Sequence, residues 1–506
     1  MNVLIVLGHP RKQSLCGALA EAYHRGVVEA GLPVRLVALA DLKFEPNVTL
    51  PSIRDMVIED DLREVMDSMA WADHLVFVYP GWWGSMPALM KAFLDRTLLP
   101  GVAFTRRADG GPMVKLWKGK TAQCLTTLDT PLPVYLKAHQ APGDNLMRNS
   151  ALGFCGVEPV HFRHFTPARE ASDTQRQAWL EEARQLGLSL KAGFEWTRAE
   201  KFRLWIRALR LQFYPKTLVA YTLGAVVVGL ASGFFSWPIY LLGYGVVFAL
   251  EAATVLSNEY FDAETDRLNQ HFTSMSGGSR VLVEGVITPR QLLTGVGLAL
   301  GVGLFLTLLL VGVSPSPMVD VFLLFGVSAL LGVGYTAPPL RLAYRTLGEL
   351  DVVVVNSLLA IVWGYVLQGG GLRESVPWML GIPLALASLP SIILAGVPDQ
   401  KADAAVGKKT LAVRLGVDKA VGLALVLTGL SALAALVYLV VPAMRVMFIP
   451  VCVVALPNAF VLMKRLSTYL KQEPRSPLVN PLLGMSLMYS LWFSLLPLVA
   501  LWVTAG

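Results

Sequence analysis

A series of long apolar segments in the C-terminal half is the feature that most constrains what this chain can fold into. Each segment is about 18–25 residues long, and a helix of that length crosses the roughly 30 Å hydrocarbon layer of a bilayer. The segments cover residues 217–236, 238–257, 291–312, 318–335, 350–368, 377–396, 417–441, 446–463 and 479–503. The sequence therefore predicts an all-α bundle of nine transmembrane helices within residues 217–506.

The composition divides the chain into three parts. Residues 1–192 form a mixed, charge-bearing sequence, whereas residues 217–506 are mostly Leu, Val, Ala, Gly and Phe. Between them, residues 193–216 combine Arg and Lys with Trp and Phe, as in helices that lie in the headgroup layer and attract anionic lipid. A solvated linker helix is the alternative for this segment. With 54% hydrophobic and 16% charged residues, the chain is expected to be an integral membrane protein.

The charges in the loops predict an orientation. Loops on the side of the N-terminal half carry many Arg and Lys, whereas the opposite loops contain only Arg373 and Arg445. By the positive-inside rule, the N-terminal half is expected on the cytoplasmic side of the inner membrane. Four cysteines without a C-x-x-C pair indicate neither a disulfide framework nor a zinc site. Although the net charge is +7, no basic cluster is interleaved with aromatics, so no nucleic-acid partner is expected.

Two acidic stripes occur where apolar segments end. Asn258, Asp262 and Asp266 follow one another at four-residue spacing, and Asp399 and Asp403 repeat that spacing after a later segment. Residues four apart lie on one face of a helix, and oxygen ligands without His or Cys suit Mg²⁺. A single stripe of this kind is more often a solvated helix end, but two stripes at cytoplasmic ends favour metal binding. We therefore predict that Asp262, Asp266, Asp399 and Asp403 bind Mg²⁺ beside a diphosphate.

Basic residues lie near these stripes. Arg280, Lys401 and Lys408, with Lys409, are expected to neutralise the phosphate charge that the metal ions leave. Several segments of this half resemble UbiA-type intramembrane aromatic prenyltransferases. They are the two stripes, the GGSR segment (277–280), YTAPPLRLAYRTLGEL (335–350) and the GKKTLAVRLG that follows Asp403. The resemblance covers about residues 205 to 505 and is closest to the branch that prenylates 1,4-dihydroxy-2-naphthoate in menaquinone synthesis.

This resemblance implies a reaction and further site residues. Mg²⁺ and basic groups would draw the diphosphate from a polyprenyl diphosphate, and an electron-rich aromatic ring would attack the resulting carbocation. Asn258 and the four aspartates would be the catalytic group. Tyr335 and Arg341, with Tyr344, would orient the diphosphate or the acceptor, although loop packing explains these three residues equally well.

The N-terminal half shows a different pattern. Short, apolar, β-rich runs alternate with segments of helical periodicity. This alternation predicts an α/β doubly wound parallel sheet in the flavodoxin-like order, with ligands at the carboxyl ends of the strands. The runs cover residues 2–8, 34–39, 74–80, 121–128 and 157–165.

Two segments follow strands at that edge. GHPRKQS (8–14) precedes a helix expected to begin near Ser14, so its backbone amides and Ser14 are candidates to cradle a phosphate, although the segment is no recognised phosphate-binding loop. Trp82 and Trp83 follow Pro80 and precede Gly84 after the third strand. Two indoles at a binding edge are costly to leave exposed unless a flat ring covers them, with core aromatics as the alternative.

The segment YPGWWGSMPALMKAFLDRTLLPGVAF (79–104) resembles the NAD(P)H:quinone oxidoreductase family. His9 and Ser14 in H-P-x3-S, the pair Thr126 and Thr127, and LGFCGV (152–157) extend the resemblance over about residues 1 to 190. It implies bound FAD or FMN lined by the Trp-Trp-Gly loop, NAD(P)H as reductant, a quinone substrate and a possible homodimer.

The proton donor that the resemblance implies is in doubt. The fourth strand continues as TTLDTP (126–131), and Tyr135 is followed by Pro-Gly-Asp (142–144), with only His139 nearby. His161 and His164 on the fifth strand are expected to be ordinary strand residues.

Together the two halves predict a bifunctional reductase and prenyltransferase, in which reduction supplies or maintains an electron-rich hydroquinone. One alternative keeps the N-terminal half as a redox-sensing or regulatory module. Another makes the C-terminal half a transporter, which would place ionisable residues deep within the spans, where Glu251 is the main example.

Overall fold

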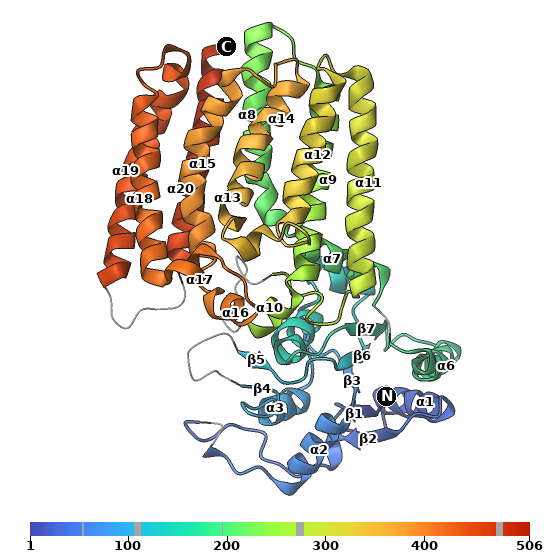
Figure 1. The fold of residues 1–506 in the computed structure, drawn as a ribbon. Helices are drawn as coiled ribbons and strands as arrows, with labels where there is room; N and C mark the ends of the chain where they lie inside the picture. The colour runs from blue at the N-terminus through green and yellow to red at the C-terminus, as the bar shows by residue number, and fades with distance from the viewer. Residues whose placement is uncertain (53–54, 106–112, 195, 270–277, 472–478, 506) are drawn as a thin grey trace. The chain divides into compact units, whose positions relative to one another are not determined.

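The computed structural model describes residues 1–52, 55–105, 113–194, 196–269, 278–471 and 479–505 (Figure 1). The described chain forms two compact units, Met1–Glu200 and Lys201–Gly506. Gly277 of the GGSR segment lies outside the described residues.

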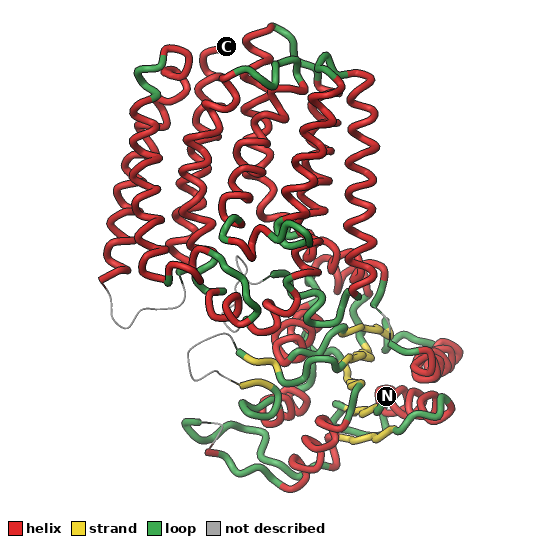
Figure 2. Tube along the Cα trace, viewed as in Figure 1, coloured by secondary structure: helices red, strands yellow, loops and turns green. Residues whose placement is uncertain are grey.

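The N-terminal unit is built on a five-stranded parallel sheet in the order β2-β1-β3-β6-β7, shown yellow in Figure 2. This confirms the predicted flavodoxin-like order. The strands are β1 (Val3–Leu7), β2 (Val34–Ala38), β3 (His74–Pro80), β6 (Thr121–Thr127) and β7 (Val160–Phe165). A two-stranded ribbon of β4 (Phe104–Thr105) and β5 (Val114–Lys115) was not predicted.

Helices cover both faces of this sheet because its central strands are apolar throughout. Every residue of β1 and β3 is buried. Val3, Ile5 and Leu7 pack with the helices α1 (Leu15–Glu29) and α6 (Asp173–Ser189) on one face. The alternate residues of β1 pack with α2 (Asp60–Trp71) and α3 (Ala88–Thr97) on the other face. The carboxyl ends of the strands therefore form an edge flanked by helix starts.

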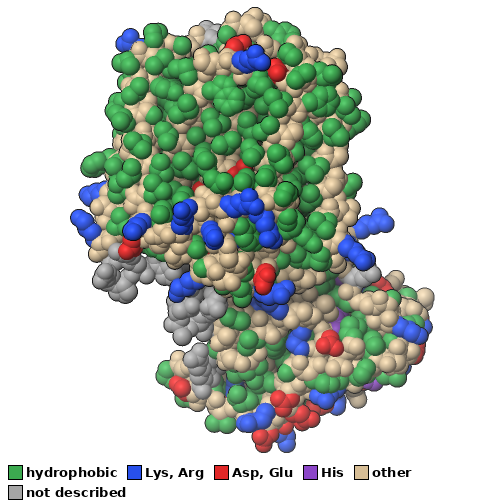
Figure 3. Space-filling model, viewed as in Figure 1, with side chains coloured by type: hydrophobic (Ala, Val, Ile, Leu, Met, Phe, Trp, Pro, Cys, Tyr) green, Lys and Arg blue, Asp and Glu red, His purple; other side chains and the backbone are tan. Residues whose placement is uncertain are grey.

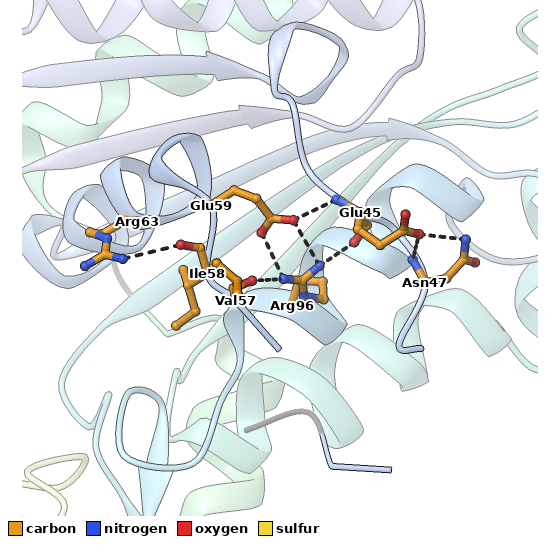
Figure 4. A network of polar contacts seen from close by, with 7 residues as sticks. All are labelled: Glu45, Asn47, Val57, Ile58, Glu59, Arg63 and Arg96. Carbon is orange, nitrogen blue, oxygen red and sulfur yellow. Dashed lines mark hydrogen bonds and ion pairs between the residues drawn. The ribbon is translucent and has the colours of Figure 1, made fainter. Parts of the chain in front are cut away.

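A buried arginine holds the long loop before α2 (Figure 4). Arg96 on α3 is 2% exposed, and its Nη2 lies 2.9 Å from Glu59 Oε2. The same nitrogen donates to the Val57 carbonyl at 2.7 Å, and Nη1 donates to the Glu45 carbonyl. A guanidinium with these partners is satisfied inside the fold, so one side chain ties Glu45, Val57 and Glu59 to α3.

The C-terminal unit is a helical bundle. Among its described residues, eight helical segments are long and apolar enough to cross a membrane, and the 17-residue α12 is shorter. The predicted span 350–368 corresponds to one of these segments, Gly348–Leu367, in which a π-helical stretch, Val354–Leu359, joins α13 to α14. The long elements are α8 (Tyr214–Ser232), α9 (Trp237–Phe261), α11 (Pro289–Val313), α12 (Met318–Gly334), α13 (Gly348–Val353) with α14 (Ala360–Leu367), α15 (Ser375–Ala395), α18 (Val417–Val437), α19 (Pro442–Lys471) and α20 (Asn480–Ala505).

Short helices lie at one end of this bundle. These are α10 (Ala263–Leu268), α16 (Gln400–Ala405) and α17 (Leu411–Leu415), drawn at its lower end in Figure 1. Figure 3 shows a hydrophobic face over the bundle, with a row of Lys and Arg side chains crossing it near that end. The amphipathic segment before the bundle contains the helix α7 (Arg198–Leu209), whose Phe202 is 66% exposed.

The helices α8 and α14 touch through their backbones at two glycines. A Cβ on Gly224 would lie 2.0 Å from the Ile361 carbonyl oxygen, and a Cβ on Gly364 would lie 1.9 Å from the Tyr221 carbonyl oxygen. Real side chains do not approach that closely, so both positions require glycine.

Replacement of Gly364 by Val is therefore expected to destabilise the bundle by about 3 kcal/mol, because the two backbones must separate. Thermal unfolding of purified protein in detergent measures the loss. Gly297→Val is the matched control, since a Cβ there meets no atom within 4 Å. Equal unfolding temperatures for the two variants would contradict the packing described.

Candidate functional site

The two acidic stripes meet at one lysine. Asp262 caps the end of α9 and is 6% exposed, whereas Asp403 on α16 is 4% exposed. Lys408 is also buried, and its Nζ lies 2.7 Å from Asp262 Oδ2 and 3.7 Å from Asp403 Oδ1. The helices α10 and α16 pack against each other, so the stripes share one site.

The other carboxyls are held by neighbouring polar groups. Asp399 Oδ1 accepts a 2.6 Å hydrogen bond from Asn269 Nδ2. Arg280 is 8% exposed, and its Nη1 donates to the backbone carbonyl of Asp266. Glu259, one residue beyond Asn258, accepts a 2.7 Å hydrogen bond from Ser279 Oγ. Neither Asn269 nor Glu259 continues the four-residue spacing, so the sequence pattern does not mark them.

Burial raises the pKa values in this cluster. The pKa of Asp266 rises to about 8, first through burial and then through the charges of Glu259 and Asp262. Burial likewise raises the pKa of Asp403 to about 7 and that of Asp399 to about 6. Burial alone would lower the pKa of Lys408, but Asp262 and Asp403 raise it above its ordinary value, so the lysine is a cation. These carboxyls are therefore desolvated and crowded, an environment that positive charge stabilises.

The donor atoms suit Mg²⁺ in chemistry. Asn258 Oδ1 and Asp262 Oδ1 are buried, and neither has a hydrogen-bond partner among the described residues. Carboxylate and amide oxygens are the ligands that Mg²⁺ prefers. Within the described part of the chain, no three His, Cys, Asp or Glu side chains converge in a metal-binding group. The oxygen atoms of these residues are chemically suited to bind Mg²⁺, and Lys408 lies between Asp262 and Asp403 in this structure.

The other residues predicted to bind the diphosphate do not all lie in the buried cluster. Tyr344 lies between two cations, because Arg341 Cζ is 5.0 Å and Lys408 Nζ 5.7 Å from its ring centroid. Tyr335 follows α12 and lines the cavity described next. Lys401 is exposed on α16, so the structure brings Lys408 but not Lys401 into the buried cluster.

A cavity of about 260 Å³ extends from the first stripe into the bundle. Asn258 and Tyr335 line it together with apolar residues of α9, α12 and α14. Two further carboxyls, Glu251 on α9 and Asp351 on α13, also line it. The sequence analysis noted Glu251 and missed Asp351, which begins an otherwise apolar run.

The candidate flavin residues gather at the carboxyl edge of the N-terminal sheet. Ser14 caps α1 as predicted, and its Oγ accepts from Gly17 N at 3.1 Å. His9 is buried and its ring meets that of Trp82 edge-on at 5.7 Å. Trp82 is 47% and Trp83 103% exposed, so neither is a core residue. An indole this exposed offers a flat surface to a flavin ring.

The turn after Pro80 presents these indoles. Trp82 and Ser85 exchange backbone hydrogen bonds of 2.8 and 3.0 Å. Trp83 and Gly84 both have positive φ, at 53° and 75°. A positive φ is unusual for tryptophan, so the backbone is held in a tight turn that turns Trp83 outward.

Thr126 and Thr127 face opposite sides of β6, as successive strand residues must. Thr127 lines a cavity of about 520 Å³ with Ser14, whereas the Thr126 hydroxyl lies 2.5 Å from His164 Nδ1. Of the two threonines, only Thr127 lines that cavity.

Thr126 begins a buried chain of polar side chains. His164 Nε2 lies 3.0 Å from Asp144 Oδ2, and the Tyr135 hydroxyl donates to Asp144 Oδ1 at 3.0 Å. All four residues are buried. Burial and Asp144 raise the pKa of Tyr135 above its ordinary value, so its hydroxyl stays protonated. His164 was predicted to be an ordinary residue of the fifth strand, but it belongs to this buried chain, because the pairing of β7 with β6 brings it beside Thr126.

Comparison with known proteins gives separate matches for the two halves. Residues 1–186 match the model of a family with a flavodoxin-like fold, and residues 218–488, more than half of the chain, match the UbiA prenyltransferase family. An NAD(P)H oxidoreductase of Haemophilus influenzae is 30% identical over 190 residues, covering 37% of this chain and 93% of that protein. The 1,4-dihydroxy-2-naphthoate octaprenyltransferase of the same organism is 26% identical over 307 residues, covering 58% and 96%. A 2-carboxy-1,4-naphthoquinone phytyltransferase of Synechocystis is 30% identical over 219 residues, covering 42% and 66%.

Proposed function

We propose a coupled activity for this chain, which belongs to the UbiA prenyltransferase family and carries an N-terminal flavodoxin-like NAD(P)H oxidoreductase domain. The N-terminal domain reduces a quinone with NAD(P)H through a bound flavin. The C-terminal domain transfers a polyprenyl group from polyprenyl diphosphate to an aromatic hydroquinone or to 1,4-dihydroxy-2-naphthoate. The observation that carries the proposal is the joining of two acidic stripes at Lys408, beside a cavity in an apolar bundle.

In prenyl transfer, the acidic stripes and the basic residues act on the diphosphate. The proposed ligands of Mg²⁺ are Asp262, Asp266, Asp399 and Asp403, together with Asn258. Bound Mg²⁺ would supply positive charge to the leaving diphosphate. Lys408 and Arg280 stabilise the remaining negative charge. Tyr335 orients the diphosphate at the cavity that it lines. Arg341 and Lys401 are both exposed, so each has at most an outer role.

The transfer breaks the allylic C–O bond, and both electrons leave with the diphosphate. An aromatic carbon supplies the electron pair of the new C–C bond, and the ring then loses the proton from that carbon. The apolar walls of the bundle exclude water, which would otherwise capture the cation.

In the reductase, the proposed contacts of FAD or FMN are His9, Ser14, Pro80, Trp82, Trp83, Gly84 and Thr127. Thr126 faces the opposite side of β6 from Thr127. A bound flavin would supply hydride-transfer chemistry between NAD(P)H and the quinone. Reduction of a quinone to a hydroquinone by hydride also consumes one proton. We assign its delivery to the Tyr135 hydroxyl, which Asp144 and His164 position.

The site is proposed to face the cytoplasm, at the inner membrane. The row of Lys and Arg at the end of the bundle that carries α16 and α17 supports this orientation. The exposed Phe202 on the basic helix α7 fits a place in the headgroup layer.

The test uses purified protein in detergent with Mg²⁺, a polyprenyl diphosphate and menadione, with mass spectrometry of the products. Prenylated menadiol is expected with NADPH and not without it, and chemically reduced menadiol is expected to replace NADPH. If menadione stays unreduced by NADPH while 1,4-dihydroxy-2-naphthoate is prenylated, the reductase half of the proposal is wrong.

A further inference from the structure

Two carboxyls within the bundle lack hydrogen-bond partners. Asp351 is 6% exposed, and its Oδ1 is buried with no partner among the described residues. Glu251 Oε1 accepts a hydrogen bond from Thr217 Oγ1 at 3.3 Å, but the buried Oε2 has no hydrogen-bond partner among the residues that the structure describes. Both residues line the 260 Å³ cavity. Figure 3 shows acidic atoms at points within the hydrophobic face of the bundle.

An unpaired carboxyl in an apolar bundle is costly. A polyprenyl tail cannot offset that cost, because hydrocarbon offers no hydrogen-bond donor. Glu251 lies on the same face of α9 as Asn258, seven residues earlier, which places it roughly 10 Å deeper along the helix. Arg210 and Lys216 line the same cavity, so its charged side chains offer contacts to a polar ligand beyond the diphosphate.

Building on the proposed function, we propose that Asp351 and Glu251 recognise the ring hydroxyls of the aromatic acceptor and so select hydroquinone over quinone. A carboxylate oxygen only accepts hydrogen bonds, and a hydroquinone hydroxyl donates one. A quinone carbonyl also only accepts, so it cannot form a hydrogen bond with either carboxylate.

This selection sets the order of the two reactions. The quinone must first gain a hydride from NAD(P)H and a proton in the N-terminal domain, and only the resulting hydroquinone binds productively in the bundle. Reduction therefore precedes prenyl transfer, and the tether between the domains delivers the acceptor in its reduced form.

The experiment compares Asp351→Asn and Glu251→Gln with the unsubstituted protein. Each amide keeps the side-chain shape but adds an N–H donor that can bind a quinone carbonyl. Anaerobic assays without NAD(P)H contain Mg²⁺, farnesyl diphosphate and menadiol, with menadione as a competing inhibitor. KM for menadiol and Ki for menadione are measured by product formation. Asp320→Asn, in the first turn of α12, is the control because it does not line the cavity.

In the unsubstituted protein, Ki for menadione is expected to exceed KM for menadiol at least tenfold. Asp351→Asn is expected to raise KM at least tenfold and to lower Ki, with KM for farnesyl diphosphate unchanged. Should Asp351→Asn fail to fold, Glu251→Gln provides the same comparison. Product formation with both constants unaltered in the amide variants would overturn this inference and leave the proposed function intact. Failure of the unsubstituted protein to prenylate any reduced acceptor would overturn both.

Discussion

Asp262→Asn is expected to lower prenyl transfer at least a hundredfold while NAD(P)H oxidation continues at its full rate. The substitution keeps the shape of the side chain, but it removes the charge that lies 2.7 Å from Lys408 and a proposed Mg²⁺ ligand. The second oxygen of Asp262, buried and without a partner among the described residues, loses its negative charge as well. Removal of Mg²⁺ with EDTA is expected to have an effect of similar size on the unsubstituted protein and little further effect on the variant.

Glu264→Gln is the matched control for this experiment. Glu264 lies two residues along the chain from Asp262, on the exposed side of α10, so its substitution removes the same charge outside the cluster. The two activities are measured on one preparation, by mass spectrometry of the prenylated product and by NADPH absorbance. Equal loss of both activities in Asp262→Asn would indicate misfolding, and full prenyl transfer would contradict the metal-binding role.

Asp144→Asn is expected to slow quinone reduction about a hundredfold, the usual range for loss of a positioned proton donor. Asp144 accepts from Tyr135 and lies 3.0 Å from His164 Nε2. An amide cannot accept through both of its ends, so one of these two contacts is broken. The expected slow step is the transfer to quinone, because reduction of the flavin by NAD(P)H needs no proton from Tyr135.

Rapid-mixing measurements separate these two steps. Flavin reduction by NADPH is expected to remain within about twofold of the unsubstituted rate, whereas reoxidation of the flavin by menadione slows. Tyr135→Phe is expected to give the same pattern, and Asp67→Asn, exposed on α2, no change. If flavin reduction and reoxidation slow equally, the chain of side chains positions the flavin rather than supplying a proton.

The regular parts of the fold follow from the sequence. Apolar runs of strand length and span length determine the sheet order and the helical bundle, because burial on both faces of a sheet or in lipid demands them. The cap at Ser14 was equally predictable, since its hydroxyl satisfies the first free backbone amides of α1. The π-helical stretch within the span 350–368 was not, because its sequence, VVNSLL, contains no proline or glycine that would mark it.

Within the site, the spacing of the aspartates indicated which helix faces meet, but it could not show which lysine is buried beside them. Lys401 lies two residues before Asp403 and Lys408 lies five residues after it, so sequence distance alone would favour Lys401. The structure buries Lys408 because Gly407, with φ at 78°, reverses the chain after α16 and lets the Lys408 amide bond back to the Asp403 carbonyl at 2.9 Å. Such a return depends on one residue of left-handed backbone, which side-chain periodicity does not reveal.

The residues of the reductase site could likewise not be brought together from the sequence alone. Tyr135, Asp144 and His164 come from three separate segments, and only the parallel pairing of β6 with β7 brings His164 beside Thr126. Sequence distance therefore concealed the histidine that completes the chain, although each residue was visible by type.

The backbone contact between α8 and α14 also bears on how the acceptor range of this protein can be redesigned. Because Gly224 and Gly364 leave no side chain between the two helices, this contact cannot be altered by substitution without separating the helices. The positions open to an engineer lie instead on α9, where Thr254 and Val255 line the cavity. Smaller residues there would widen the cavity while the glycine contact keeps α8 and α14 packed together.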